Sequence, residues 1–184
     1  MVTFTSGLQL TERNLVLTGY TEPNKPRLGR QVAERLRMRF VNVEEVIEQR
    51  TGDSIAVIRQ NYGERRLKTV ECEIMEEIML HRNSVIRVNG STLMHSDHYE
   101  RLQRTSVMIC LVARLDAILQ QMHLMLGARY HDPVERGTQL GHLRREWAVR
   151  SKPGLHEIDA TDYDSDQVIA AILAIWQEMA IERA

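Results

Sequence analysis

The loop that follows the first apolar run of the chain carries residues that could bind phosphate. The run Asn14-Leu15-Val16-Leu17-Thr18 ends at Gly19, and Lys25 follows shortly before a helical pattern begins. Glycine lets successive backbone N–H groups converge on a phosphate, and lysine supplies a compact positive charge. In a β-α-β unit, the loop after the first strand is the usual phosphate site. The loop that begins at Gly19 is therefore the predicted phosphate-binding segment.

Apolar runs alternate with amphipathic segments, and this alternation predicts the elements that position the loop. Apolar runs buried on both faces are typical of parallel strands, whereas apolar residues three and four apart indicate helices. Strands are predicted over 14–19, 40–43, 84–88, 107–112 and 157–160. Helices are predicted over 28–36, 44–50, 54–62, 64–81, 98–104, 115–126 and 166–181, with breaks at Thr51-Gly52 and Gly63. The order predicts an α/β protein, a three-layer α/β/α sandwich with a five-stranded parallel sheet.

Glycine, proline and charged residues interrupt the pattern between about 127 and 141, where we expect a mobile loop or lid. Residues 1–12 show no periodicity and are predicted to form a tail. Residues 13–184 are predicted to form one domain, because a chain of 184 residues that is 43% hydrophobic can bury a single core.

Composition excludes several classes of partner. The chain has 24 basic and 25 acidic residues, well mixed, and a net charge of −1, which favours neither nucleic acid nor an anionic membrane. No apolar run approaches the about 18 residues of a membrane span, and no secretion signal opens the sequence. Cys72 and Cys110 lie in apolar segments and are expected to be reduced and buried. We therefore expect a cytoplasmic protein.

Several stretches, read in order, resemble shikimate kinases. These are Asn14–Gly19, Gly29–Leu36, Phe40–Glu44 and Ile47–Gly52, followed by Ser54-Ile55-Ala56, Gly63-Glu64 with Glu71, and Asn89-Gly90-Ser91. The resemblance covers roughly residues 13 to 178. It implies a P-loop fold like that of nucleoside-monophosphate kinases, with a helical substrate-binding region, a lid, and ATP and Mg²⁺ as cofactors.

The phosphate loop departs from the family pattern G-x-x-x-x-G-K-[ST]. The aligned stretch is Gly19-Tyr20-Thr21-Glu22-Pro23-Asn24-Lys25-Pro26, in which Asn24 could replace the second glycine. The resemblance thus assigns Gly19, Asn24 and Lys25 to phosphate binding. Pro26 has neither an N–H nor a hydroxyl. Glu22 adds an anion, and two unit charges about 4 Å apart repel by roughly 4 kcal/mol at an effective dielectric of about 20. The alternative is structural, with Pro26 opening a helix and Lys25 paired with Glu22.

The second strand ends in Asn42 and Glu44, where the family has aspartates for Mg²⁺ and for the shikimate hydroxyls. Asn42 brings no charge to a cation, and Glu44 keeps a carboxylate on a longer arm. The resemblance thus assigns Glu44 to a substrate pocket. The alternative is that Glu44 stabilises the start of the following helix.

The other substrate-pocket residues that the resemblance implies are Lys68, Asn89, Gly90 and Arg145, with Arg129 in the lid. Lys68 stands where the family has a carboxylate-binding arginine, and it keeps the charge without the bidentate fork. Asn89-Gly90-Ser91 replaces a glycine triplet. Arg144 or Arg145 falls near a second carboxylate-binding arginine. For Lys68 and the arginines, the alternative is an ordinary solvated side chain on a helix.

Two histidines, His95 and His98, lie three residues apart. No cysteine or carboxylate cluster accompanies them at ligand spacing, so no metal site is predicted. Ser96, Asp97 and His98 are adjacent in sequence and do not make a catalytic triad.

Three functions follow from this reading. The first is a shikimate-kinase-like pseudoenzyme without catalytic residues, which binds a small anionic or polyol ligand. The second is an ATP-dependent kinase of shikimate or of another small hydroxylated metabolite. The third is a protein–protein interaction module, and Trp176 on the last helix is either a core residue or part of a homodimer contact.

Overall fold

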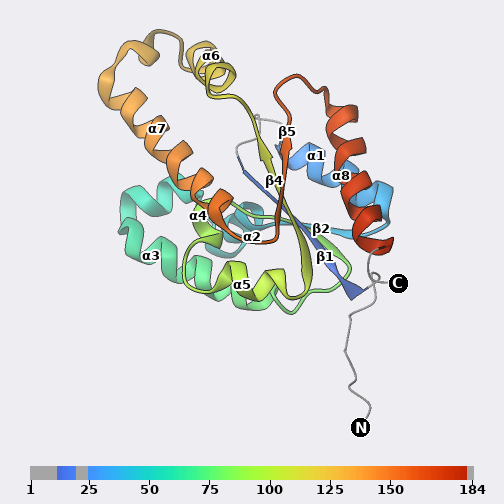
Figure 1. The fold of residues 1–184 in the computed structure, drawn as a ribbon. Coiled ribbons are helices and arrows are strands. Elements are labelled where there is room, and N and C mark those ends of the chain that lie inside the picture. The colour runs from blue at the N-terminus through green and yellow to red at the C-terminus, as the bar shows by residue number, and fades with distance from the viewer. Residues whose placement is uncertain (1–11, 20–24, 182–184) are drawn as a thin grey trace.

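The computed structural model describes residues 12–19 and 25–181, and its centre is a sheet of five parallel strands. The strands follow the order β2-β3-β1-β4-β5 (Figure 1). Their bounds are β1 (Asn14–Thr18), β2 (Arg39–Asn42), β3 (Ser84–Arg87), β4 (Ser106–Val112) and β5 (Leu155–Asp159). The predicted five-stranded parallel sheet is confirmed.

Helices cover both faces of the sheet, which confirms the predicted three layers (Figure 1). One face carries α1 (Lys25–Leu36) and α8 (Ser165–Ile181). The other carries α2 (Val43–Thr51), α3 (Ile55–Ile78), α4 (Gly90–Leu93) and α5 (His98–Gln103). Leu15 and Leu17 pack against the first group of helices and Val16 against the second. A strand buried on both faces needs an uninterrupted apolar run.

The last helix contributes Trp176 to the core. Its side chain is 7% exposed and packs with Ile172 and Val168 against the α1 face of the sheet. Burial of this residue supports the core alternative over a contact between two copies of the chain.

The helical region between β2 and β3 contains both predicted breaks. Gly52 ends α2 with a φ of 77°, and Gly63 interrupts α3 with a φ of 81° and a ψ of 167°. Both values lie in regions that glycine enters at little cost. Gly63 therefore divides α3 into two helical segments.

The segment from 127 to 141 is helical, so the expected loop is wrong. It comprises η2 (Gly127–His131) and most of α7 (Pro133–Trp147), which follow α6 (Leu115–Leu126). Asp132 accepts a hydrogen bond from the Val134 N–H, and Pro133 opens the helix. These are favourable N-terminal features, and they offset the cost of about 1 kcal/mol for each glycine inside the helix. The lid assignment for this segment stays a prediction.

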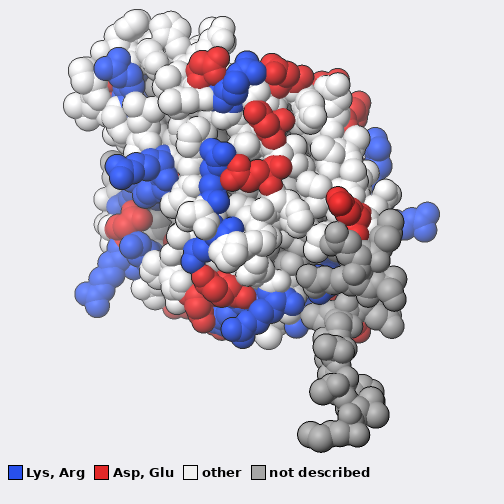
Figure 2. Space-filling view, in the orientation of Figure 1, with Lys and Arg blue, Asp and Glu red and all other residues white. Residues whose placement is uncertain are grey.

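The surface mixes both signs of charge. Figure 2 shows acidic and basic side chains interspersed over the visible face rather than gathered by sign. Among the described helices, none has the length and apolar character that a membrane crossing requires. The predicted tail, residues 1–12, lies outside the described residues except for Glu12.

Candidate functional site

Gly19 directly follows the central strand β1, at the edge of the sheet where the predicted phosphate loop begins. Its φ is +96°, and a Cβ at this position would lie 2.2 Å from the backbone oxygen of Leu111 in β4. Only glycine fits this approach of two backbones. Of the other predicted loop residues, Lys25 begins α1, and Asn24 lies outside the described residues.

A buried arginine that the sequence analysis missed organises the neighbouring strand ends. Arg87 is the last residue of β3, and its side chain is 9% exposed. Its Nη1 atom donates to Asn42 Oδ1 and to Glu44 Oε2, each across 3.1 Å. Asn89 Nδ2 donates to Glu44 Oε1 across 2.7 Å. We call Asn42, Glu44, Arg87 and Asn89 the strand-end network.

The strand-end network does not fit a Mg²⁺ site. Magnesium needs free oxygen ligands with negative charge in octahedral geometry. Here the guanidinium of Arg87 neutralises Glu44 and occupies the oxygen of Asn42. These two residues, which align with the family's aspartates, are thus engaged with a fixed cation of the protein itself.

The backbone at the start of α4 is held by a second unpredicted residue, Glu146 of α7. Its carboxylate accepts hydrogen bonds from the Gly90 N–H across 2.6 Å and from the Ser91 hydroxyl across 2.8 Å. A Cβ on Gly90 would lie 2.2 Å from the Glu146 backbone oxygen. The end of α7 is therefore docked on α4, and an amide that the resemblance assigned to substrate already has an anionic partner.

A hydrogen bond joins two of the predicted substrate-pocket residues. Glu44 and Asn89 meet in the strand-end network, and Gly90 lies next to it in the chain. Arg145 is exposed and contacts the Nδ1 atom of His142 at 2.9 Å. Arg129 is exposed on η2.

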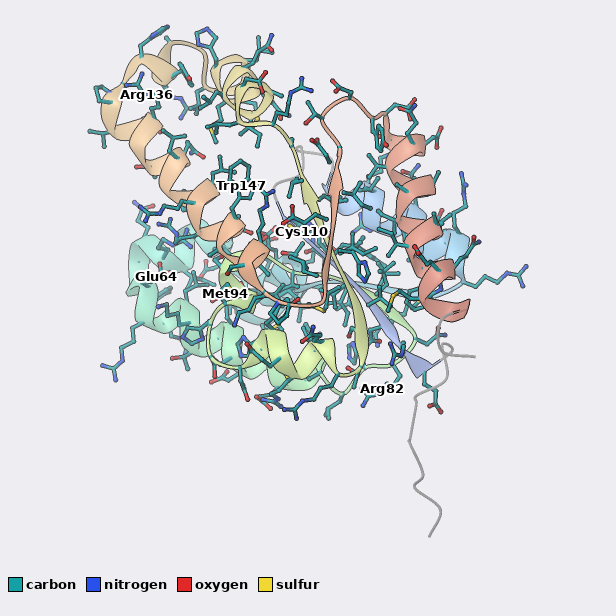
Figure 3. The ribbon with its side chains drawn as sticks, viewed as in Figure 1. Glu64, Arg82, Met94, Cys110, Arg136 and Trp147 are labelled. Atoms are coloured by element: carbon teal, nitrogen blue, oxygen red, sulfur yellow. The ribbon has the colours of Figure 1, made fainter. Side chains whose placement is uncertain are left out.

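Lys68 lines a hollow of about 620 Å³ beside α3, together with Glu64, Glu73 and His95. In Figure 3, Glu64 on α3 and Met94, which precedes His95, mark this side of the molecule. The side chains around the hollow carry both signs of charge. Such a lining can bind a small polar ligand through a cation and several acceptors.

Cys72, which also lines the hollow, lies next to His95 and His98. Cys72 Sγ lies 3.3 Å from His95 Nδ1, and ligand atoms of Cys72, His95 and His98 all lie within 4.8 Å of one another. Spacing in the sequence did not indicate this cysteine neighbour, and the absence of a metal site stays a prediction. Cys72 is 23 residues before His95 in the chain, and only the packing of α3 against the α4–α5 segment brings them together.

A buried carboxyl group, that of Glu71, lies next to this cluster and links α3 to α4. Glu71 is 9% exposed and accepts a hydrogen bond from Thr92 Oγ1 across 2.9 Å. Burial raises the pKa of Glu71, and the Thr92 hydroxyl only partly offsets that rise. The pair joins α3 to α4.

Arg87 and Glu146 carry different amounts of sequence information. Arg87 breaks an otherwise apolar strand at its carboxyl end, which is the edge where parallel sheets bind ligands, so that position was a usable signal. Glu146 is one of many charged residues on a polar helix, and nothing in its sequence context distinguishes it.

Comparisons of the sequence with a family model and with curated proteins point to the same family. The family model described as shikimate kinase matches residues 24–175. A shikimate kinase of Thermodesulfovibrio yellowstonii is 33% identical over 110 residues, which are 60% of this chain and 64% of that protein. The match thus spans less than two thirds of that relative's length. A shikimate kinase of Oceanobacillus iheyensis is 26% identical over 168 residues, 90% of each chain.

Solved structures share the fold. The shikimate kinase of Bacteroides thetaiotaomicron superposes with a TM-score of 0.73 at 19% identity, covering 91% of this chain and 98% of that one. The Acinetobacter baumannii shikimate kinase, in complex with shikimate, gives 0.71 at 19% identity over 91% and 94%. A gluconokinase of Sinorhizobium meliloti gives 0.63 at 13% identity over 95% and 96%. At these identities the likeness concerns the fold.

Proposed function

The chain belongs to the shikimate kinase family, and we propose that it is a member that binds a small anionic or polyol ligand without ordinary ATP-dependent phosphoryl transfer. Family membership supplies the scaffold, whereas function depends on the residues that the scaffold carries. Cytoplasmic location and the lid role of 127–141 belong to the same proposal.

The observation that carries the proposal is the hydrogen bonding of Arg87 to Asn42 and Glu44. Phosphoryl transfer in P-loop enzymes depends on Mg²⁺ to bridge and neutralise the phosphates. A guanidinium bonded to both side chains repels a divalent cation from this edge. The side chains described at this edge therefore do not provide the Mg²⁺ ligands that phosphoryl transfer requires.

The loop sequence supports the same reading. Pro26 supplies neither the N–H nor the hydroxyl of the family's last loop position, and Glu22 adds a negative charge next to the phosphates. Both the metal-binding positions and the phosphate-binding positions thus differ from the family pattern.

The hollow beside Lys68 is the proposed ligand site. Lys68 offers a positive charge to an anionic group, and Glu64 and Glu73 can accept hydrogen bonds from hydroxyls. A small molecule with both kinds of group matches this lining.

The second candidate is an ATP-dependent kinase of shikimate or another small hydroxylated metabolite. It is favoured by the position of Arg87, which lines a shallow hollow with Thr18 and Gly19 at the end of the central strand. A guanidinium is a good phosphate ligand, so Arg87 could hold a phosphate in place of a metal.

Calorimetric titration with Mg·ATP and with shikimate, alone and together, tests the two candidates, with a coupled assay for ADP release. We expect no shikimate-dependent ADP release. Release that saturates with both compounds, and that disappears in Arg87→Met, would establish the kinase instead.

Ligand binding itself is tested with Lys68→Met. We expect the affinity for small carboxylated polyols, shikimate among them, to fall in this variant. Arg66→Met is the matched control, because Arg66 is an exposed cation on the same helix and is not among the residues that line the hollow. Equal affinities in both variants would place the ligand elsewhere.

A further inference from the structure

Side chains that ligate metals converge from separate elements beside the hollow. Cys72 belongs to α3, His95 lies between α4 and α5, and His98 is the first residue of α5. Zinc bonds of about 2.0–2.3 Å in a tetrahedron place neighbouring ligand atoms roughly 3.3–3.6 Å apart. The 3.3 Å between Cys72 Sγ and His95 Nδ1 already matches this spacing, and the remaining distances are no more than 4.8 Å.

His98 is prepared as a ligand by its other ring nitrogen. Its Nδ1 atom lies 2.9 Å from the backbone oxygen of Thr92, and its side chain is buried. A carbonyl oxygen can only accept, so Nδ1 donates to it, and Nε2 is the ring nitrogen that neutral His98 offers to a metal. Thr92 is itself fixed by its hydrogen bond to Glu71. Supporting contacts of this kind accompany most metal-bound histidines.

The other two groups are also chemically suited to a metal. Cysteine sulfur and imidazole nitrogen are the ligand atoms that zinc prefers in proteins. A metal binds the thiolate form of cysteine, so binding at Cys72 would release the thiol proton to solvent.

The hollow leaves room for a fourth ligand. Cys72 and His95 line its wall, with Lys68 and Glu73 nearby. Three protein ligands and a water molecule in the fourth position are the arrangement of catalytic zinc sites. We propose that Cys72, His95 and His98 bind a divalent ion of the zinc type, with a fourth coordination position open to the hollow.

The experiment is a titration of the chelator-treated full chain with Co²⁺, a spectroscopic substitute for zinc, followed by competition with Zn²⁺. Co²⁺ is expected to bind at one equivalent, with the near-ultraviolet charge-transfer band of a thiolate ligand and the visible bands of tetrahedral cobalt. Zn²⁺ should remove both bands and raise the melting temperature. These readouts do not depend on whether the chain transfers phosphate.

Variants at each ligand make the test specific. Cys72→Ser should lose the charge-transfer band, and His95→Asn should weaken Co²⁺ binding at least tenfold. His98→Asn should do the same while keeping an N–H donor for the Thr92 carbonyl. His142→Asn, a half-buried histidine of α7, is the control and should bind like the parent chain. Circular dichroism confirms that each variant is folded. A parent chain without the thiolate band, or a band that persists in folded Cys72→Ser, would overturn the proposal.

Discussion

Arg87 and Glu44 bond across 3.1 Å, yet their exposures differ, at 9% for the Arg87 side chain and 38% for that of Glu44. Loss of the pair would destabilise the fold mainly through Arg87, because a buried charge without its partner is costly away from water. Solvent screens the exposed carboxylate. The main role of the strand-end network is therefore to supply hydrogen-bond partners to a buried guanidinium, and it differs in this from a surface ion pair.

Glu44→Ala tests this description. Among the described residues, the variant leaves Arg87 with the side-chain amides of Asn42 and Asn89 as partners. We expect the free energy of unfolding in urea to fall by about 1–2 kcal/mol. Glu45→Ala is the neighbouring control, because Glu45 pairs with the exposed Arg30. It should cost less than about 1 kcal/mol. Equal losses would mean that burial of Arg87 contributes nothing.

Removing the Glu146 carboxylate should loosen the docking of α7 on α4. Glu146→Ala leaves the Gly90 N–H and the Ser91 hydroxyl without their partner, at an expected cost of about 1–3 kcal/mol. Hydrogen exchange at the Gly90 amide should become faster. Ser91→Ala removes only one of these contacts and should have a smaller effect; an unchanged Gly90 amide in Glu146→Ala would contradict the docking.

Gly19→Ala should be far more damaging than Gly52→Ala. Both glycines have positive φ, so each substitution carries a backbone strain of about 1–2 kcal/mol. At Gly19 the new methyl would also lie 2.2 Å from the Leu111 oxygen, whereas Gly52 has nothing within 4 Å. Thermal unfolding of both variants separates the steric cost from the conformational one. Similar melting temperatures would show that the backbone of β4 near Leu111 can shift to make room for the methyl group.

Glu71 should make stability fall as pH rises through the acid range. Its pKa lies above the ordinary value of 4.5, so the folded state holds the proton after the unfolded chain has lost it. Stability therefore declines from about the ordinary value up to the raised pKa and is level above it. Glu71→Gln keeps an acceptor for Thr92 and should remove this decline, as measured by urea unfolding at a series of pH values.

Glu48→Gln, on the exposed surface of α2, controls for the general loss of a charge. A decline that persists in Glu71→Gln with the same steepness would assign it to another group.

The two thiols should react at different stages of unfolding. Cys110 is fully buried in β4, and burial raises its pKa to about 12. Cys72 is only half-buried. A thiol reagent should therefore modify one thiol in the folded chain and both in denaturant, and folded Cys72→Ser should be inert. Fast modification of folded Cys72→Ser would show that β4 opens.

Sequence patterns were sufficient for the central strands because a parallel strand that is buried on both faces is mostly apolar. Leu15 faces one layer and Val16 the other, so the run itself identifies the strand. The pattern was insufficient for α7. Gly137 and Gly141 suggested a loop, but the cap at Asp132 and tertiary contacts stabilise a helix through them. Local propensity is a weak guide where packing decides.

The candidate site was less predictable because its contacts are distant in the chain. Glu44 meets Arg87, and Glu146 meets Gly90, across more than forty residues. A motif can indicate that Gly90 or Glu44 is special, but it cannot show which side chain occupies the space in front of it. The pairing of Cys72 with His95 is of the same kind.

The strand order also has a consequence for synthesis on the ribosome. The central strand β1 is among the first described parts of the chain, yet one of its two neighbours is β4, in which Ser106 pairs with Asn14 and Cys110 with Thr18. Until β4 has been translated, one edge of β1 has no partner. Such long-range pairing slows folding and leaves an apolar edge exposed in the meantime. Nascent chains that end before β4 should therefore be clients of chaperones.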